Sequence, residues 1–190
     1  MRALRLLLRQ SLWTAIGVFW RVSKRIILVR RLSLSALGML LATVCTTLLA
    51  ATLEEGVAAY QLGDYEAAFK IFRPLAEQGN TAAEYNVGQM YRMGRGTTRD
   101  FAEAAKWYRL AAGQGDALSQ FNLGMMYYNA QGVPQSLVLS HMWLTISALS
   151  GADNAVKNRT MLAKQMSREQ VNEAVQLART CQKQNFKNCD

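Results

Sequence analysis

From residue 54 onward, apolar side chains recur at the three- and four-residue intervals of amphipathic helices, in runs that glycines interrupt. Residues 54–78 read as two helices that separate at Gly63, with Asp64 placed to cap the second helix. Pro74 is expected to kink this second helix or to end its regular hydrogen bonding. The pattern predicts a helical hairpin.

Two more hairpins follow. In one, a first helix over 82–93 leads through a glycine loop to a second helix that begins at Asp100, where Glu103 is expected to complete a capping box. In the next, a first helix lies within 121–130 and a second helix runs through 141–148. The chain from residue 54 is therefore predicted to be all-α.

A spacing of 36 residues relates these hairpins. It separates Gly79, Gly115 and Gly151 from one another. The same spacing relates further residues: Ala76, Ala112 and Ala148, then Asp64/Asp100, Asn86/Asn122, Gly88/Gly124, Tyr91/Tyr127, Gly96/Gly132 and Trp107/Trp143. A fixed period of this length marks stacked supersecondary units that cannot bury their apolar faces alone. We expect an α/α solenoid with an extended ligand-facing surface.

Domain boundaries follow from this period. The predicted repeats are 54–79, 80–115 and 116–151. After Gly151 the repeat signature fades, although 154–165 and 168–181 still look helical and Ser167 with Gln170 predicts a second capping box. Residues 152–190 are therefore expected to form an atypical terminal cap.

Small and aromatic residues are predicted to share the packing. Small side chains allow the helix axes to approach closely, at Ala83, Gly88, Ala104 and Ala112. Aromatic rings are expected to fill the space between the layers, at Tyr91, Trp107, Tyr108, Tyr127 and Trp143.

The leader, residues 1–53, contains an uncharged run over 32–53 that would span about 33 Å as a helix, enough for a hydrocarbon core of roughly 30 Å. Arg30 and Arg31 precede it, so the positive-inside rule places the following part outside the inner membrane. A cleaved signal peptide and a retained transmembrane anchor both fit. The run within 1–28 has two interpretations as well: a helix on the membrane surface, or a start codon that truly lies at Val29.

The net charge of +9 belongs to this leader. Residues 1–31 hold eight of the 22 basic residues and no acid, whereas 52–190 hold 14 Lys and Arg against all 13 Asp and Glu. A nearly neutral folded part has no footprint for a phosphate backbone, so no nucleic-acid partner is expected. Membrane contact is expected through residues 1–53 only, and the localisation is predicted to be periplasmic.

Cysteine usage agrees with export. Cys45 lies in the leader, and Cys181 and Cys189 are the two cysteines that follow it. In an oxidising compartment this pair reads as a disulfide that pins the C-terminal tail and stabilises by roughly 2–3 kcal/mol at most. Two free thiols are the alternative.

The repeated residues resemble the Sel-one-like repeat (SLR) family, a branch of the tetratricopeptide superfamily, over about 54–151. The second unit matches the family pattern at Ala83, Val87, Gly88, Tyr91, Gly94, Gly96, Asp100, Ala104, Trp107, Tyr108, Ala111, Ala112 and Gly115. The third matches it at Leu123, Gly124, Tyr127, Gly132, Val133, Trp143, Ala148 and Gly151. Thr97 in place of Val and Ala130 in place of Gly depart from the pattern. The resemblance implies an adaptor or scaffold for other proteins, with exported bacterial members linked to envelope assembly and signalling.

A partner-binding groove is predicted on the first helix of each hairpin. At about 100° per residue, Ala83, Val87, Met90 and Tyr91 share the core arc. The residues on and beside the opposite arc form the predicted groove for a protein or peptide: Tyr85, Asn86, Gln89, Arg92, Phe121, Asn122, Met125, Tyr128 and Asn129. Asn86 and Asn122 are placed to clamp successive backbone amides of a peptide. Packing of Phe121 and Tyr128 against the neighbouring unit is the alternative.

Nothing in the sequence assembles a catalytic site. His141 lies in an apolar helix and reads as a core or boundary residue, and one histidine with two tail cysteines lacks the ligand spacing of a zinc site. No serine is followed three residues later by lysine, as a β-lactam-binding site requires, and the loop from Gly94 to Gly96 follows no strand. We expect a non-enzymatic scaffold without cofactor or metal. A peptidoglycan- or glycan-binding module is the alternative, and a hydrolase is the least favoured.

Overall fold

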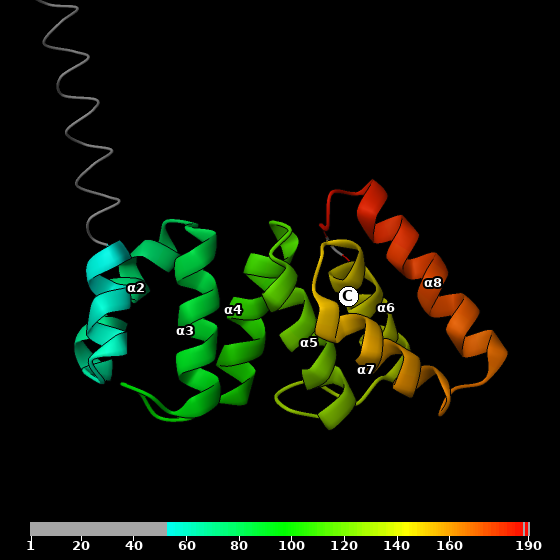
Figure 1. Cartoon of the computed structure of the whole chain (residues 1–190), viewed down its shortest axis with the longest axis horizontal. Helices are drawn as coiled ribbons and strands as arrows, with labels where there is room; N and C mark the ends of the chain where they lie inside the picture. Colours follow the sequence, from blue (N-terminus) through cyan, green and yellow to red (C-terminus); the bar gives the residue numbers. More distant parts are fainter. Residues whose placement is uncertain (1–52, 188, 190) are drawn as a thin grey trace, which may run out of the picture. The chain divides into compact units, whose positions relative to one another are not determined.

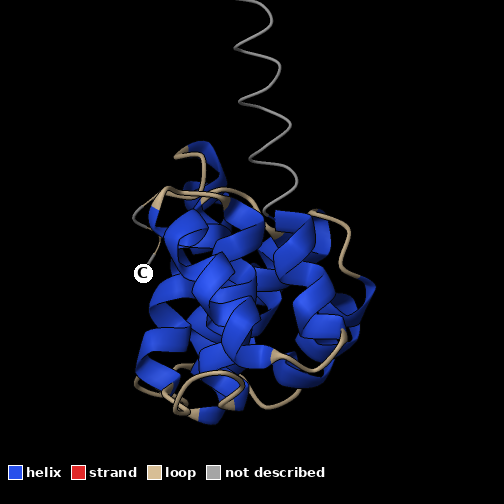
Figure 2. Ribbon diagram, turned by 90° about the vertical axis from the view of Figure 1, so that its left-hand side faces the viewer, coloured by secondary structure: helices blue, strands red, loops and turns tan. Residues whose placement is uncertain are grey.

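The 36-residue period reappears in the helix boundaries of the computed structural model, which describes residues 53–187 and 189. Residues 53–61 are helical. The helices that follow are α2 (Tyr65–Glu77), α3 (Thr81–Met93), α4 (Phe101–Gly113), α5 (Ala117–Asn129), α6 (Leu137–Leu149), α7 (Asp153–Ala163) and α8 (Arg168–Lys183). The second helices α2, α4 and α6 begin 36 residues apart, and so do α3, α5 and α7. Helices and loops account for all of the described chain (Figure 2).

Each helix packs against its neighbour in the chain from α2 to α7, and α8 returns to pack against α6 (Figure 1). This arrangement is the predicted all-helical solenoid. Hydrogen bonds between units repeat with the same period: Arg73 donates to the Tyr91 hydroxyl over 2.8 Å, and Arg109 donates to the Tyr127 hydroxyl over 3.0 Å. The interface between successive units is therefore built from equivalent residues.

Glycines fix the loops where the chain passes close to the preceding unit. Gly96 and Gly132 have φ near +70°, and a Cβ on Gly132 would lie 2.2 Å from the Phe101 carbonyl carbon at the start of α4. Only a residue without a side chain fits such a contact. Ala130 adopts the same left-handed conformation that Gly94 adopts one repeat earlier, with φ 54°.

Helix termini confirm most of the capping predictions. Asp64 caps α2, and Ser167 with Gln170 forms the predicted capping box. At Asp100 the predicted hydrogen bond from its backbone N–H to the Glu103 side chain is not formed. The Asp100 N–H donates to the Tyr91 carbonyl, and the Glu103 carboxylate contacts Lys106.

Pro74 does not end its helix, because α2 continues to Glu77. Its nitrogen has no N–H to donate to the Lys70 carbonyl, and the helix nevertheless continues for three residues beyond it.

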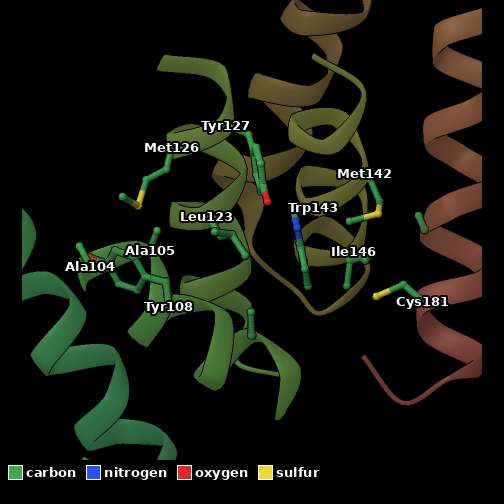
Figure 3. Packing of buried hydrophobic residues seen from close by; sticks show 12 residues of the cluster. Ala104, Ala105, Tyr108, Leu123, Met126, Tyr127, Met142, Trp143, Ile146 and Cys181 are labelled. Atoms are coloured by element: carbon green, nitrogen blue, oxygen red, sulfur yellow. The ribbon is translucent and has the colours of Figure 1, made fainter. Parts of the chain in front are cut away.

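Three clusters of buried residues form the core along the stack. One joins α2 and α3 to Trp107, a second joins α4, α5, α6 and α8, and a third joins α6 to α7. Figure 3 shows the second cluster, in which Tyr108, Leu123, Trp143 and Cys181 come from four different helices. The aromatic residues predicted to fill the core are buried there, except Tyr91, which is half-buried.

A disulfide joins Cys181 to Cys189, the pairing that the sequence suggests, and excludes two free thiols in this structure. No helix in the described part of the chain has both the length and the apolar character needed to cross a bilayer. Residues 32–52 of the predicted span, and the rest of the leader before them, lie outside the described residues.

Candidate functional site

The predicted groove residues lie on α3 and α5, one turn after another along each helix. We call the outward positions of α3, α5 and α7 the first-helix face. It comprises residues 85, 86, 89, 92 and 93 of α3 and the residues 36 and 72 positions later. Asn129 is exposed, and the other eight predicted residues are half-buried. The face is therefore accessible, but most of its side chains also pack against neighbouring helices.

Tyr85 and Arg92 are held by contacts that connect α3 to α4 and α5. The Tyr85 ring lies 6.0 Å from the Tyr108 ring and packs against the core cluster to which α4 and α5 contribute. Burial is the main cause that raises the pKa of Tyr85, so the phenol is neutral at physiological pH. Arg92 donates to the Tyr108 hydroxyl over 3.3 Å. These side chains have defined positions before any partner arrives.

Phe121, Met125 and Tyr128 pack against the cluster of Leu144 and its neighbours on α6 and α7. The sequence left open that these residues pack on the neighbouring unit, and part of the surface of each side chain does so. All three remain partly accessible. They contribute both to the junction between α5 and α7 and to the floor of the face.

The asparagines form a ladder along the face. Asn86 and Asn122 each donate a side-chain N–H to the backbone carbonyl four residues earlier, over 2.8 and 2.9 Å. Asn158 makes the same bond within α7 over 2.8 Å. Each asparagine side chain thus uses one of its N–H groups within its own helix. Fewer of its hydrogen-bonding groups are left for a peptide backbone than the predicted clamp requires.

Sequence reasoning missed the part of the face contributed by α7 and the two residues that follow it. Asn158, Met161 and Gln165 lie 36 residues after Asn122, Met125 and Asn129. The signal was the period itself, which continues past Gly151 although the glycine and tryptophan signature does not. The face therefore extends over three first helices.

Charge on the face is positive but sparse. Its charged positions are Arg92 on α3 and Lys157 on α7, with Lys164 at the end of α7. The acidic residue within α3, Glu84, is 3% exposed and turns away from the surface. This distribution favours a neutral or weakly acidic partner.

The structure offers little acid–base chemistry. His141 is 4% exposed, and burial, together with the charge of Arg159, lowers its pKa, so the imidazole is neutral at pH 7. Its Nδ1 lies 3.4 Å from the Thr145 hydroxyl. Within the described residues no group of His, Cys, Asp and Glu side chains is placed to hold a metal ion.

Comparison with known proteins identifies the repeats. The Sel1 repeat model matches residues 47–80, 81–116 and 117–151, more than half of the chain. The structure resembles c5321, described as a protective antigen of uropathogenic Escherichia coli strains with an SLR fold. That match has 26% identity and a TM-score of 0.69, and it covers 74% of this chain and 31% of c5321.

Two further comparisons are shorter. A Sel1 repeat protein from Oxalobacter formigenes is 31% identical with a TM-score of 0.52, over 55% of this chain and 41% of that protein. The DAP3-binding cell death enhancer 1 proteins of Rattus norvegicus and Mus musculus are 49% identical over 41 residues, 22% of this chain. This chain spans only about 8% of the length of these curated relatives.

Proposed function

This chain belongs to the Sel1 repeat family, and we propose that it is a scaffold that binds another protein along its first-helix face. Sel1 repeats indicate a protein–protein interaction scaffold, and proteins built from them are generally not catalysts. The observation that carries the proposal is the alignment of α3, α5 and α7 in one register, with outward side chains repeating every 36 residues. A surface of this kind suits an extended or helical segment that contacts several repeats at once.

The composition of the face supports a neutral or weakly acidic protein segment. Gln89 and Asn129 supply amides, Met93 and Met161 are 40% and 46% exposed, and Arg92 supplies charge. Methionine side chains adapt to varied apolar partners, and the amides satisfy polar groups beside them. The scaffold is non-catalytic in this proposal.

Site-specific photo-crosslinking tests the surface directly. A photoreactive phenylalanine analogue placed at Gln89 or Asn129 should give discrete crosslinked products in the cells that make the protein. The same analogue at Lys106 or Leu110, exposed residues of the second helix α4, serves as the matched control. Crosslinking from the α4 positions, with none from Gln89 and Asn129, would contradict the proposal.

Export to the periplasm and a role in envelope assembly or signalling are the finer part of the proposal. They are supported by the uncharged run over 32–53 behind Arg30 and Arg31, and by the disulfide. Alkaline phosphatase folds only in an oxidising compartment. If it is fused to the chain after residue 190, we expect it to be active in the intact cell. An inactive phosphatase fusion beside an active cytoplasmic reporter would contradict export.

Glycan binding has less support. It would use exposed aromatic rings as stacking platforms, and every aromatic side chain within residues 53–187 is buried or half-buried.

A further inference from the structure

One position of the repeat changes character in the third unit. Phe72, Tyr108 and Leu144 lie 36 residues apart on successive second helices, and each is at most 1% exposed. A glycine of the preceding first helix faces this position: a Cβ on Gly88 would lie 3.0 Å from the Tyr108 ring, and one on Gly124 would lie 3.1 Å from the Leu144 Cγ. The third unit therefore places an aliphatic side chain where the first two units place an aromatic ring.

A pocket lies beside this position in the third unit. Beside Leu144, between α5, α6 and α7, there is a cavity of about 160 Å³, with Met125, Met161 and Leu162 on its apolar wall. A cavity of about 150 Å³ accommodates benzene in other proteins. The space therefore has the size of one aromatic ring.

Ser140 is the polar residue of this pocket on α6. It lies one repeat after Ala104, is fully buried and lines the cavity. Its hydroxyl has no hydrogen-bond partner among the described residues. A buried hydroxyl without a partner is unfavourable, so a ligand that carries its own hydroxyl would gain a hydrogen bond there.

The lining of the pocket is uncharged, and its outer edge reaches the first-helix face. Gln165 is exposed at this edge, where its side chain contacts the Tyr128 hydroxyl at 3.3 Å. Neutral polar groups surround the entrance and apolar groups surround the interior. A charged ligand would lose its hydration here without gaining a counter-charge.

We propose that this pocket receives one tyrosine side chain of the protein partner, whose ring fills the space that Tyr108 fills one repeat earlier and whose hydroxyl bonds Ser140. The inference rests on the proposed function, because the pocket opens on the first-helix face. Leu144, Leu162 and Met161 contact the ring, and the partner's backbone lies across α5 and α7. The tyrosine is the specificity element of the surface.

The pocket can be tested without knowing the partner. The full chain, labelled with ¹³C at its methionine methyl groups, is titrated with p-cresol, the analogue of a tyrosine side chain. Ring-current shifts should appear at Met125 and Met161 and saturate, while Met93 on the far part of the face is unchanged. Capped tyrosine (N-acetyl-tyrosinamide) should move the same two signals, whereas benzylamine, which is cationic, should not.

Two variants make the test specific. Leu144→Tyr restores the ring found in the second unit opposite the equivalent glycine, so it should fold and abolish the p-cresol shifts. Ser140→Ala restores the residue found at Ala104; it should leave toluene binding unchanged and remove the threefold to tenfold preference for p-cresol over toluene that one hydrogen bond provides.

The proposal that the pocket binds a phenol ring would be overturned by either of two results. One is the absence of shifts at Met125 and Met161, and the other is p-cresol binding that persists in folded Leu144→Tyr. If photo-crosslinks still form along the face in that case, the proposed function stands and only the tyrosine receptor falls. If p-cresol binds as expected and no crosslink forms, the pocket stands as a site for a small free phenol and its role in partner binding falls.

Discussion

At the scale of single residues, the left-handed loop positions decide how closely one unit can follow another. Gly132 has φ +70° and no room for a Cβ against the start of α4. Ala130, two residues earlier, has φ 54° and carries a Cβ. Two residues of one loop thus both have positive φ but different steric surroundings.

This contrast yields the first prediction. Gly132→Ala should lower the free energy of unfolding by at least about 2 kcal/mol, because the Cβ meets backbone atoms that cannot move independently. Ala130→Gly should raise it by up to about 1 kcal/mol by relieving the left-handed strain. Urea unfolding of both variants measures the two effects; equal and small changes would mean that the loop does not contact α4.

Glu84 yields the second prediction. Burial raises the pKa of this carboxyl above its ordinary value of 4.5, partly offset by a hydrogen bond from Gln114. The folded protein therefore holds this proton to higher pH than the unfolded chain, and the Glu84 contribution to stability falls as pH rises through the interval between the two pKa values. Glu84→Gln, which introduces the residue found at Gln120, should raise Tm at pH 7 by about 2–4 °C.

Thermal unfolding at pH 7 and at pH 4 checks this account of Glu84. The advantage of Glu84→Gln should shrink at the lower pH, where the Glu84 carboxyl is mostly protonated in the folded and in the unfolded state. If the Tm of Glu84→Gln exceeds that of the wild type by the same amount at both pH values, proton release from Glu84 does not cause the difference.

The sequence predicted the turn and capping residues correctly but did not predict that Glu84 is buried. The turn glycines and the capping residues Asp64 and Ser167 act through local geometry, which a one-dimensional pattern contains. The burial of Glu84 depends on where α4 ends, because its partner Gln114 lies 30 residues away. No local pattern distinguishes a buried glutamate from an exposed one.

At the scale of elements, α8 leaves the repeat geometry. It packs against α6, and Cys181 enters the core cluster of α4, α5 and α6 (Figure 3). The disulfide to Cys189 returns the tail toward α4, where the Phe186 ring would lie 3.5 Å from a Cβ on Gly115. The tail thus covers the end of α4.

Loss of this disulfide is the third prediction. Cys189→Ser should lower the free energy of unfolding by about 2 kcal/mol, because the released tail gains conformational entropy in the unfolded state and loses its anchor in the folded one. Calorimetry with and without a reductant gives the comparison, since the variant should be insensitive to the reductant. A reductant that leaves wild-type stability unchanged would contradict this role.

Element assignments from the sequence were accurate where the period was strong. The hairpins and the glycine loops follow directly from it, and α7 begins 36 residues after α5 although it was interpreted only as part of a cap. The exposed surface of α7 lacks the glycine and tryptophan residues that mark earlier units, because no further unit of this kind packs on it. The sequence offered the packing of Phe121 and Tyr128 against a neighbouring unit only as an alternative, because α7 was not assigned as the next first helix.

At the scale of the whole molecule, the described part of the chain is a stack in which overlapping clusters connect neighbouring units. Trp107 of α4 belongs to the cluster of α2 and α3, while Tyr108 beside it belongs to the next cluster. The second helix α4 therefore links the cores on its two sides, and α6 does the same through Trp143 and Leu144. The first helices then carry outward side chains that are held in place by these cores, which suits a preformed binding surface.

Oxidative footprinting of a partner complex tests the central claim, that the first-helix face is the binding surface. Met93 and Met161 are exposed at opposite ends of this face, and Leu110 is 52% exposed on α4. Once photo-crosslinking has supplied a partner, hydroxyl-radical oxidation of Met93 and Met161 should fall severalfold in the complex while oxidation of Leu110 stays the same. Unchanged oxidation of both methionines, with protection of Leu110, would contradict the account.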